Sequence, residues 1–268
     1  IGRGDVLQQA DIPVKLERKQ LGENLQDHLQ LRCAYKVSGI PTLNEKASKL
    51  TGKAMIGLEY LLRRSGPMSM APSQFGMFTR STPGANRPDI EYHVQPLSTD
   101  KLGDPLHPFP AITVSVCQLR PSSVGTCHIT STDPHQQPEI RPNYLSTEED
   151  RSIAISAIRQ ARLVMAANAW RPYEPEEILP GTQFEDDNAL LQKAGDIATT
   201  IFHPVGTCRM GADADAVVDA TLCVKGVQGL RIVDASIMPR IVTGNTASPV
   251  VMIAEKAADM IRMERRGA

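Results

Sequence analysis

The spacing of apolar residues along the chain predicts a mixture of helices and strands. Apolar residues that recur every three or four positions indicate helices with one buried face. These helices are expected at residues 5–10, 47–64, 146–167, 186–194 and 249–261. Alternating or continuous apolar runs that are rich in Val, Ile and Thr indicate strands. These strands are expected at residues 12–16, 31–37, 89–94, 111–119, 125–131, 138–143 and 229–236.

The order of these elements predicts an α+β chain with two structural units. A turn at residues 120–123 separates two predicted strands, so residues 111–119 and 125–131 are expected to pair as antiparallel neighbours. The middle of the chain mixes helices with antiparallel strands, whereas the tail reads as a strand followed by a long helix. Residues 21–28 are expected to form a polar turn, with His28 bonded to neighbouring backbone rather than to a metal.

Composition excludes several classes of protein. A formal net charge of −1 gives no electrostatic reason to expect nucleic acid or an anionic membrane as a partner. Every apolar run is interrupted by Lys, Arg or Asp before it reaches the length of a membrane span. The 5 cysteines are odd in number and widely spaced, without a CxxC pair. Neither a disulfide framework nor a metal site is therefore expected, and reduced thiols in a cytoplasmic type of compartment fit best.

Three polar residues of the tail are candidates for chemistry. His203 lies in a turn-forming run and could exchange a proton near neutral pH, because an unperturbed histidine has a pKa of about 6.5. The alternative is a histidine that only bonds the turn backbone. Asp234 ends a predicted strand, where ligands bind in open α/β sheets, or it is a capping acid. Asn245 directly precedes the long apolar helix, whose N-terminal amides favour an electron-rich group.

Longer segments resemble one family of enzymes. The runs HPVGTCRMG and VVDATLCVKGVQGLRIVDASIMPRIVTGNTASPVVMIAEKAADMI resemble the C-terminal signature of the glucose–methanol–choline (GMC) flavoprotein oxidoreductases. GENLQDH resembles the segment that leads into the family's substrate domain. Further blocks resemble that domain in the family's order, namely GPMSMAPSQFGMF, RPDIEYH, LRPSSVGTCHI and DPHQQPEIRPNYLS. The resemblance covers essentially the whole chain.

This resemblance implies a division of the chain. Residues 1–36 are expected to belong to an FAD-binding domain and a connecting segment, and residues 37–195 to an antiparallel-sheet substrate domain with helices. Residues 196–268 are then the C-terminal part of a Rossmann-like FAD-binding domain and carry the active site. The glycine-rich N-terminal half of that domain is absent from this chain. The chain opens at Ile1 with neither an initiator methionine nor a signal peptide, so it is expected to be the C-terminal part of a longer protein.

The resemblance also implies roles for individual residues. His203 is the expected active-site base and Asn245 its partner. Residues that would contact FAD or pack near the flavin are Asp234, Ala235, Asn245, Thr246 and Ile201. Residues that would line the substrate pocket are His93, Gln74 and Phe202.

The function implied is FAD-dependent oxidation of a primary alcohol to an aldehyde, by proton abstraction and hydride transfer to flavin N5. Choline-oxidising members carry Glu where this chain has Gln74, so a neutral alcohol is favoured and choline is the runner-up. A non-enzymatic alternative also remains open, in which the chain is a remnant or an assembly module that binds no FAD and catalyses no reaction. The electron acceptor, oxygen or a quinone type, is left open. The expected location is the cytoplasm, with peripheral membrane association as an option.

Overall fold

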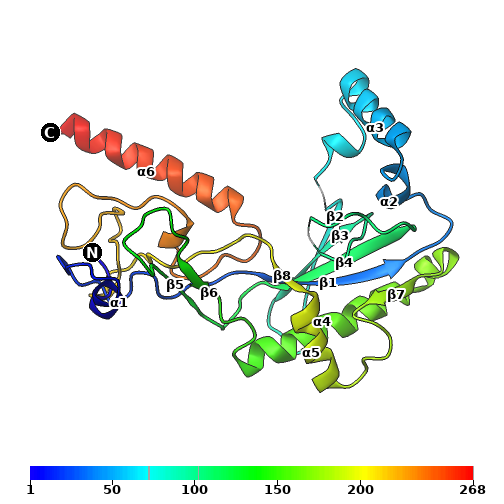
Figure 1. Cartoon of the computed structure of the whole chain (residues 1–268), viewed down its shortest axis with the longest axis horizontal. Coiled ribbons are helices and arrows are strands. Elements are labelled where there is room, and N and C mark those ends of the chain that lie inside the picture. Colours follow the sequence, from blue (N-terminus) through cyan, green and yellow to red (C-terminus); the bar gives the residue numbers. More distant parts are fainter. Residues whose placement is uncertain (72, 102, 268) are drawn as a thin grey trace. The chain divides into compact units, whose positions relative to one another are not determined.

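The structure is a computed structural model that describes residues 1–71, 73–101 and 103–267, and these residues fall into two compact units (Figure 1). The first, here called the tail unit, contains Ile1–His28, Leu119–Asp150 and the tail from Thr200. The second, here called the sheet unit, contains Leu29–Gln118 and Arg151–Thr199. Residues 119–150 thus group with the tail, although the family-based division puts them in the substrate domain. That division into substrate and FAD-binding domains stays a prediction.

The sheet unit is built on one antiparallel sheet. Within the described residues the sheet has six strands in the order β2-β3-β4-β1-β7, and β8 also pairs with β1. Their bounds are β1 (Leu29–Lys36), β2 (Phe75–Thr79), β3 (Ile90–Gln95), β4 (Ala111–Gln118), β7 (Glu176–Leu179) and β8 (Ala198–Thr200). The central strands β1 and β4 pair along their length, from Gln30 opposite Cys117 to Lys36 opposite Ala111. The predicted strands 31–37, 89–94 and 111–119 are therefore confirmed, with small shifts at their ends.

The two faces of this sheet differ in chemistry, because successive side chains of a strand point to opposite faces. One face is apolar over β1, β3 and β4. Its members are Leu31, Cys33, Ile90, Tyr92, Val114 and Val116, all buried. The Tyr92 hydroxyl donates a hydrogen bond of 2.8 Å to the carbonyl of Ala157 in α4 (Glu148–Met165), so this helix lies against the apolar face.

The helices of the sheet unit follow the expected periodicity. Besides α4 they are α2 (Leu43–Lys46), α3 (Leu50–Arg63) and α5 (Asp187–Ile197), with 3₁₀ turns at Pro67–Ser69 and Asn168–Tyr173. In α4 the buried apolar positions are Ala154, Ala157, Ile158, Ala161 and Met165, a helical spacing. The carboxylate of Asp186 caps α5 by accepting a 2.9 Å hydrogen bond from the amide of Ala189. Helix α3 has the predicted apolar residues but buries none of them.

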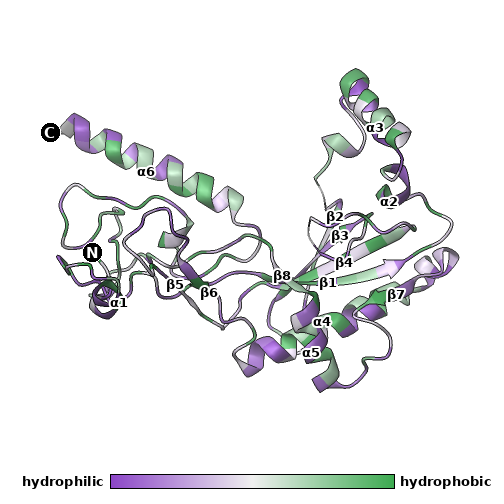
Figure 2. Ribbon diagram, in the orientation of Figure 1, coloured by the Kyte–Doolittle hydropathy of each residue, from purple (hydrophilic) through white to green (hydrophobic). Residues whose placement is uncertain are grey.

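The tail unit contains little regular structure apart from its last helix. Its elements are α1 (Gly4–Gln9), β5 (Thr126–His128), β6 (Glu139–Arg141), the 3₁₀ turn Ala235–Ile237 and α6 (Ala247–Gly267). Strands β5 and β6 form a two-stranded antiparallel sheet of their own. Apolar and polar residues alternate along α6 (Figure 2). No helix in the described ranges is long and apolar enough to cross a membrane.

Three strand predictions are wrong in this structure. Residues 111–119 pair with β1 and β3, whereas residues 125–131 contribute only β5, so the expected hairpin between them is absent. Residues 12–14 have no regular structure, and residues 15–16 form a bend. Residues 229–236 make only an isolated bridge, between Cys223 and Arg231. The apolar side chains of Ile232 and Val233 pack against a buried cluster around Val217 and Val218 instead, so their apolarity reflects packing without a strand ladder.

The first turn of α4 contains a buried aspartate, Asp150, whose hydrogen bonds are expected to stabilise the fold. Asp150 is 2% exposed and accepts hydrogen bonds from the backbone amides of Ser122 at 2.9 Å and Ser123 at 2.8 Å. Burial by itself raises the pKa of Asp150, but these hydrogen bonds outweigh burial and hold the pKa below its ordinary value. The carboxylate therefore stabilises the fold above the unfolded-state pKa of about 3.9. This stabilisation is lost as pH falls through the lowered folded-state pKa.

We expect Asp150→Ala to lower the free energy of unfolding at pH 7 by about 1–3 kcal/mol, because buried amides lose a charged acceptor. The deficit relative to the unmodified protein should shrink in acid, where the native carboxylate is protonated as well. Urea unfolding at pH 7 and at lower pH measures both effects. Asp133→Ala, at an exposed loop position, is the matched control and should change little. An equal deficit at every pH would contradict the assignment.

Candidate active site

A short polar segment, Asn24–His28, organises the tail unit around His203. Gln26 and Val205 exchange two backbone hydrogen bonds, of 3.0 and 2.9 Å. The Gln26 side-chain oxygen accepts a 3.0 Å hydrogen bond from the amide of Ile241. The Asn24 side-chain amide donates to the carbonyl of Pro239 at 3.1 Å. The segment predicted to be a polar turn does turn at residues 21–22, but Leu25 and Gln26 make isolated bridges, and the segment joins the His203 stretch to residues 239–241.

Asp27 clamps the backbone of His203. The Asp27 side chain is buried, and its Oδ1 accepts a 2.9 Å hydrogen bond from the amide of His203. Its Oδ2 accepts hydrogen bonds of 2.5 Å from the hydroxyls of Tyr144 and Thr200. Burial raises the pKa of Tyr144 well above its ordinary value, and the bond to Asp27 adds to this. Tyr144 therefore remains a donor, and the carboxylate is held by three donors, one from Tyr144 and two from the stretch Thr200–His203.

The ring of His203 is oriented by His28. The two Nδ1 atoms lie 3.0 Å apart, and the rings meet edge to face at 81°. His28 is fully buried, and its Nε2 lies 3.2 Å from the carbonyl of Leu119. A carbonyl can only accept, so His28 carries its proton on Nε2 and presents Nδ1 as an acceptor. A neutral His203 ring in this arrangement donates from Nδ1, and its Nε2 is then the nitrogen that carries the lone pair.

The residues just before His203 are held in an unusual backbone conformation. Phe202 has φ 63°, a left-handed region that bulky residues rarely adopt, and its side chain is 67% exposed. Its amide donates a 2.9 Å hydrogen bond to the Thr200 hydroxyl. The amide of Ile201 donates to the carbonyl of His28 at 3.3 Å. Strained backbone of this kind is often found at functional sites, where surrounding contacts enforce it.

The residues expected to contact FAD lie close to the same core. Val205, Met238 and Ile241 form a buried cluster, and Ala235 and Val250 pack against it. This cluster brings the His203 stretch, the Ala235–Ile237 turn and the start of α6 together within one unit. The residues predicted to act in catalysis or to contact FAD lie on or next to these three segments.

Asp234 has the role of a capping acid in this structure. Its Oδ1 accepts a 2.8 Å hydrogen bond from the amide of Ser236 at the start of the 3₁₀ turn, and the expected strand before it is absent. Asp234 is exposed, as is Asn245, which lies two residues before the start of α6. Thr246 is buried, and its carbonyl accepts a 3.0 Å hydrogen bond from Val250 in the first turn of α6.

This donor set fits a flavin nucleotide. An exposed carboxylate can accept hydrogen bonds from hydroxyl groups, and an exposed amide can both donate and accept. The first amides of a 21-residue helix favour an electron-rich group, through their unpaired donors and the helix dipole. Asp234, Asn245 and the first turn of α6 would hold such a group.

The substrate-pocket candidates are divided between the two units. Phe202 is in the tail unit beside His203, whereas Gln74 and His93 belong to the sheet unit. Gln74 is exposed, and its backbone N–H donates a 3.0 Å hydrogen bond to the carbonyl of Val94, next to β2. His93 lies in β3 with its Nε2 3.2 Å from a carboxylate oxygen of Glu91.

Sequence reasoning missed the residues that position His203, which are Asp27, His28, Tyr144 and Thr200. The signal that was available is the GENLQDH run, whose polar residues directly precede β1. In the structure the aspartate and the histidine of this run are both almost fully buried, which is not expected of polar residues in an exposed turn.

A family model described as GMC oxidoreductase matches residues 121–254, which include His203, Asp234 and Asn245. The chain belongs to the GMC oxidoreductase family. The resemblance predicted from the sequence is therefore confirmed, as is the mixture of helices with an antiparallel sheet. Enzymes of this family depend on FAD.

Relatives and solved structures agree with this membership. The chain is 40% identical over 264 residues to "Choline dehydrogenase, mitochondrial" of Mus musculus and 39% identical over 262 residues to "Oxygen-dependent choline dehydrogenase" of Proteus mirabilis. It covers 44% and 47% of these proteins, so it spans about half the length of the curated relatives it matches.

Two solved structures share the fold. Pyridoxine 4-oxidase from Mesorbium loti superposes with a TM-score of 0.81 at 27% identity, over 98% of this chain and 48% of that one. Formate oxidase from Aspergillus oryzae RIB40 superposes with a TM-score of 0.90 at 24% identity, over 100% of this chain and 51% of that one.

Proposed function

We propose that this chain supplies the base and part of the flavin contacts for the FAD-dependent oxidation of a primary alcohol to an aldehyde. The observation that carries the proposal is the His203 ring, bonded through Nδ1 to His28 at 3.0 Å. A neutral imidazole with a fixed tautomer and a backbone clamped by Asp27 is suited to accept a proton. The glycine-rich half of the flavin site is proposed to lie outside these residues.

Different residues of the chain are proposed to have different roles in the reaction. The alcohol loses two hydrogens, one as a proton from its hydroxyl and one as a hydride from its α-carbon. Nε2 of His203 takes the proton, and the amide of Asn245 donates to the substrate oxygen as negative charge develops on it. FAD, when bound, supplies the acceptor for the hydride. Asp234, Ala235, Asn245 and Thr246 are proposed to contact FAD, and Ile201 is proposed to pack near its flavin ring.

The substrate class is proposed to be a neutral primary alcohol. Gln74, His93 and Phe202 are the residues proposed to contact it. Gln74 has no carboxylate with which to balance a trimethylammonium group, and this disfavours a quaternary ammonium substrate. Choline is the second candidate, because the relatives that are 39–40% identical carry the name choline dehydrogenase.

The experiment that tests the proposal is turnover by the protein assembled with an FAD-binding N-terminal half. Aldehyde formation is measured with simple primary alcohols and with choline. We expect saturable oxidation of one or more neutral alcohols, with kcat/KM above that for choline. Greater kcat/KM for choline would overturn the substrate assignment, and bound FAD without oxidation of any alcohol would overturn the proposed function.

Gln74→Glu tests the argument from charge. We expect the added carboxylate to raise kcat/KM for choline about tenfold relative to a neutral alcohol, a difference of roughly 1.4 kcal/mol in transition-state binding. Replacement of the exposed Gln136 by Glu, which adds the same charge in a loop of the tail unit, is the control. An unchanged ratio in Gln74→Glu would show that this position does not select substrate charge.

A further inference from the structure

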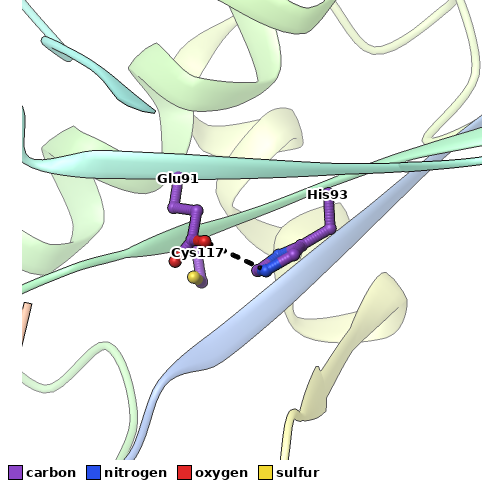
Figure 3. Close-up of side chains that lie close together, drawn as sticks. All are labelled: Glu91, His93 and Cys117. Atoms are coloured by element: carbon purple, nitrogen blue, oxygen red, sulfur yellow. Dashed lines mark ion pairs between the residues drawn. The ribbon is translucent and has the colours of Figure 1, made fainter. Parts of the chain in front are cut away.

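Three potential metal ligands converge on the polar face of the sheet. Glu91 and His93 come from β3 and Cys117 from β4, and one ligand atom of each lies within 4.8 Å of the others (Figure 3). His93 Nε2 is 3.2 Å from Glu91 Oε1. The side chains of Glu91 and His93 are only 7% and 13% exposed, and Cys117 is 1% exposed. The cluster is therefore almost completely shielded from solvent.

Strand geometry explains why these side chains meet. Glu91 and His93 are two residues apart in β3, so they point to the same face. Cys117 lies directly opposite Glu91, and Ser115 lies opposite His93. Side chains at such paired positions are neighbours on one face of an antiparallel sheet. The face continues onto β1, where Gln30 pairs with Cys117 and Arg32 with Ser115.

Two buried oxygen atoms on this face lack a hydrogen-bond partner among the described residues, and both belong to the cluster or its edge. They are Oε2 of Glu91 and Oγ of Ser115, which is itself fully buried. Buried polar atoms in native proteins are nearly always bonded, and an exception calls for an explanation such as an ion. A cation bound by Glu91 would satisfy its carboxylate, and a water on that cation could bond Ser115.

We propose that Glu91, His93 and Cys117 form a binding site for a zinc ion, with a fourth position open to water. Zinc prefers tetrahedral sites made of thiolate, imidazole and carboxylate ligands. Ligand atoms around a tetrahedral zinc lie roughly 3.3–3.8 Å apart, given its bond lengths of about 2.0–2.3 Å. Separations of at most 4.8 Å reach that range through small side-chain rotations.

Charge balance also favours zinc at this place. Zinc binding releases the Cys117 thiol proton to solvent, so the thiolate and the Glu91 carboxylate together neutralise the two positive charges of the ion. Neutral His93 completes the set as the third ligand. The mixed sulfur and nitrogen ligands favour zinc over magnesium or calcium, which prefer oxygen ligands.

The site differs from the sequence expectation, which included no metal. That expectation rested on the absence of closely spaced cysteines. The ligands here come from two strands that are neighbours in space, and only one of them is a cysteine. The site shares His93 with the residues proposed to contact the alcohol, but none of its ligands is the proposed base or a proposed flavin contact.

Titration with Co²⁺ as a spectroscopic stand-in for zinc tests the proposal. The untagged full chain, reduced and freed of metal, is titrated under nitrogen, and difference spectra are recorded. We expect one equivalent of Co²⁺ to produce a sulfur-to-cobalt charge-transfer band and the visible bands of a tetrahedral site, and Zn²⁺ to displace it. Cys117→Ser should abolish the charge-transfer band. Glu91→Gln and His93→Gln should each weaken Zn²⁺ binding at least about tenfold, since even outer-shell changes cost this much.

The matched control is Cys33→Ala, which removes a buried cysteine from the opposite face of the same sheet and should leave the cobalt spectrum unchanged. X-ray absorption of the zinc-loaded unmodified protein avoids any dependence on variants that fail to fold. It should show one sulfur at about 2.3 Å with nitrogen and oxygen ligands at about 2.0–2.2 Å. Absence of stoichiometric binding, a zinc shell without sulfur, or an intact charge-transfer band in Cys117→Ser would each overturn the site and leave a structural Glu91–His93 ion pair.

Discussion

Replacing His203 with alanine is expected to slow flavin reduction by alcohol about 10²–10⁴-fold, the contribution typical of a positioned general base. The substrate would then have to lose its hydroxyl proton to solvent. FAD binding should persist, because the proposed flavin contacts lie on other segments. The hydrogen bond between the His203 amide and Asp27 uses the backbone, so alanine also keeps the clamp on this stretch.

Anaerobic stopped-flow mixing of the assembled protein with alcohol measures this rate directly. His135→Ala, which removes an exposed histidine from a loop of the tail unit, is the control and should react at the unmodified rate. The absorbance spectrum of the bound flavin verifies that cofactor is retained in each variant. A flavin-reduction rate that is unchanged in His203→Ala would remove this residue from the mechanism.

Removing the Asp27 carboxylate should cause the largest loss of stability in the tail unit. In Asp27→Ala the hydroxyls of Tyr144 and Thr200 and the amide of His203 all lose a buried, charged acceptor. Each unsatisfied donor carries a desolvation cost of about 1–3 kcal/mol, and relaxation recovers part of it, so we expect a net loss of about 3 kcal/mol. Because this carboxylate also fixes the His203 backbone, catalysis should fall together with stability.

Denaturant unfolding and steady-state kinetics test the two effects separately. Asp27→Asn keeps an acceptor oxygen and should recover part of both losses, as expected for a positioning residue. Asp259→Ala, on the exposed side of α6, is the control for loss of an aspartate and should stay within about 0.5 kcal/mol of the unmodified protein. A stability loss in Asp27→Ala no larger than in this control would show that the clamp contributes nothing.

Local patterns in the sequence were sufficient for most helices and for the central strands. Helices α4 and α6 have long apolar periodicity, and the run Ala111–Gln118 is continuous and β-branched, so their type is determined by neighbouring residues. The helix at 186–194 also has a capping aspartate at its start, which the structure retains. In these cases the side chains that define the element also bury its face.

Pairing between distant strands could not be predicted in the same way. Strand β4 was expected to pair with the next strand in the chain, the economical choice, but its partners β1 and β3 both precede it. Hydrophobic alternation indicates that a strand has a buried face without naming its neighbour. The run ending at Asp234 was misread for a related reason, since side chains that pack on a core from a loop produce the same apolar pattern as a strand.

In the candidate site too, some residues could be predicted from the sequence and others could not. His203, Asp234 and Asn245 were found from residue type and from resemblance, but their neighbours at Asn24–His28 were not. The bonds from this segment span 175 residues from His28 to His203 and 215 from Gln26 to Ile241, so no local pattern could reveal them. Polar residues between two apolar runs look like a turn in the sequence, whether or not their side chains are buried. In the structure most of the segment Asn24–His28 is buried, and its side chains orient the proposed base.

The measurement that most directly tests the central claim is anaerobic reduction of bound FAD by a primary alcohol in a single turnover. We predict that the flavin absorbance bleaches in one saturable phase with one aldehyde formed per flavin. Flavin that is bound stoichiometrically yet stays oxidised with every primary alcohol, choline included, would contradict the account.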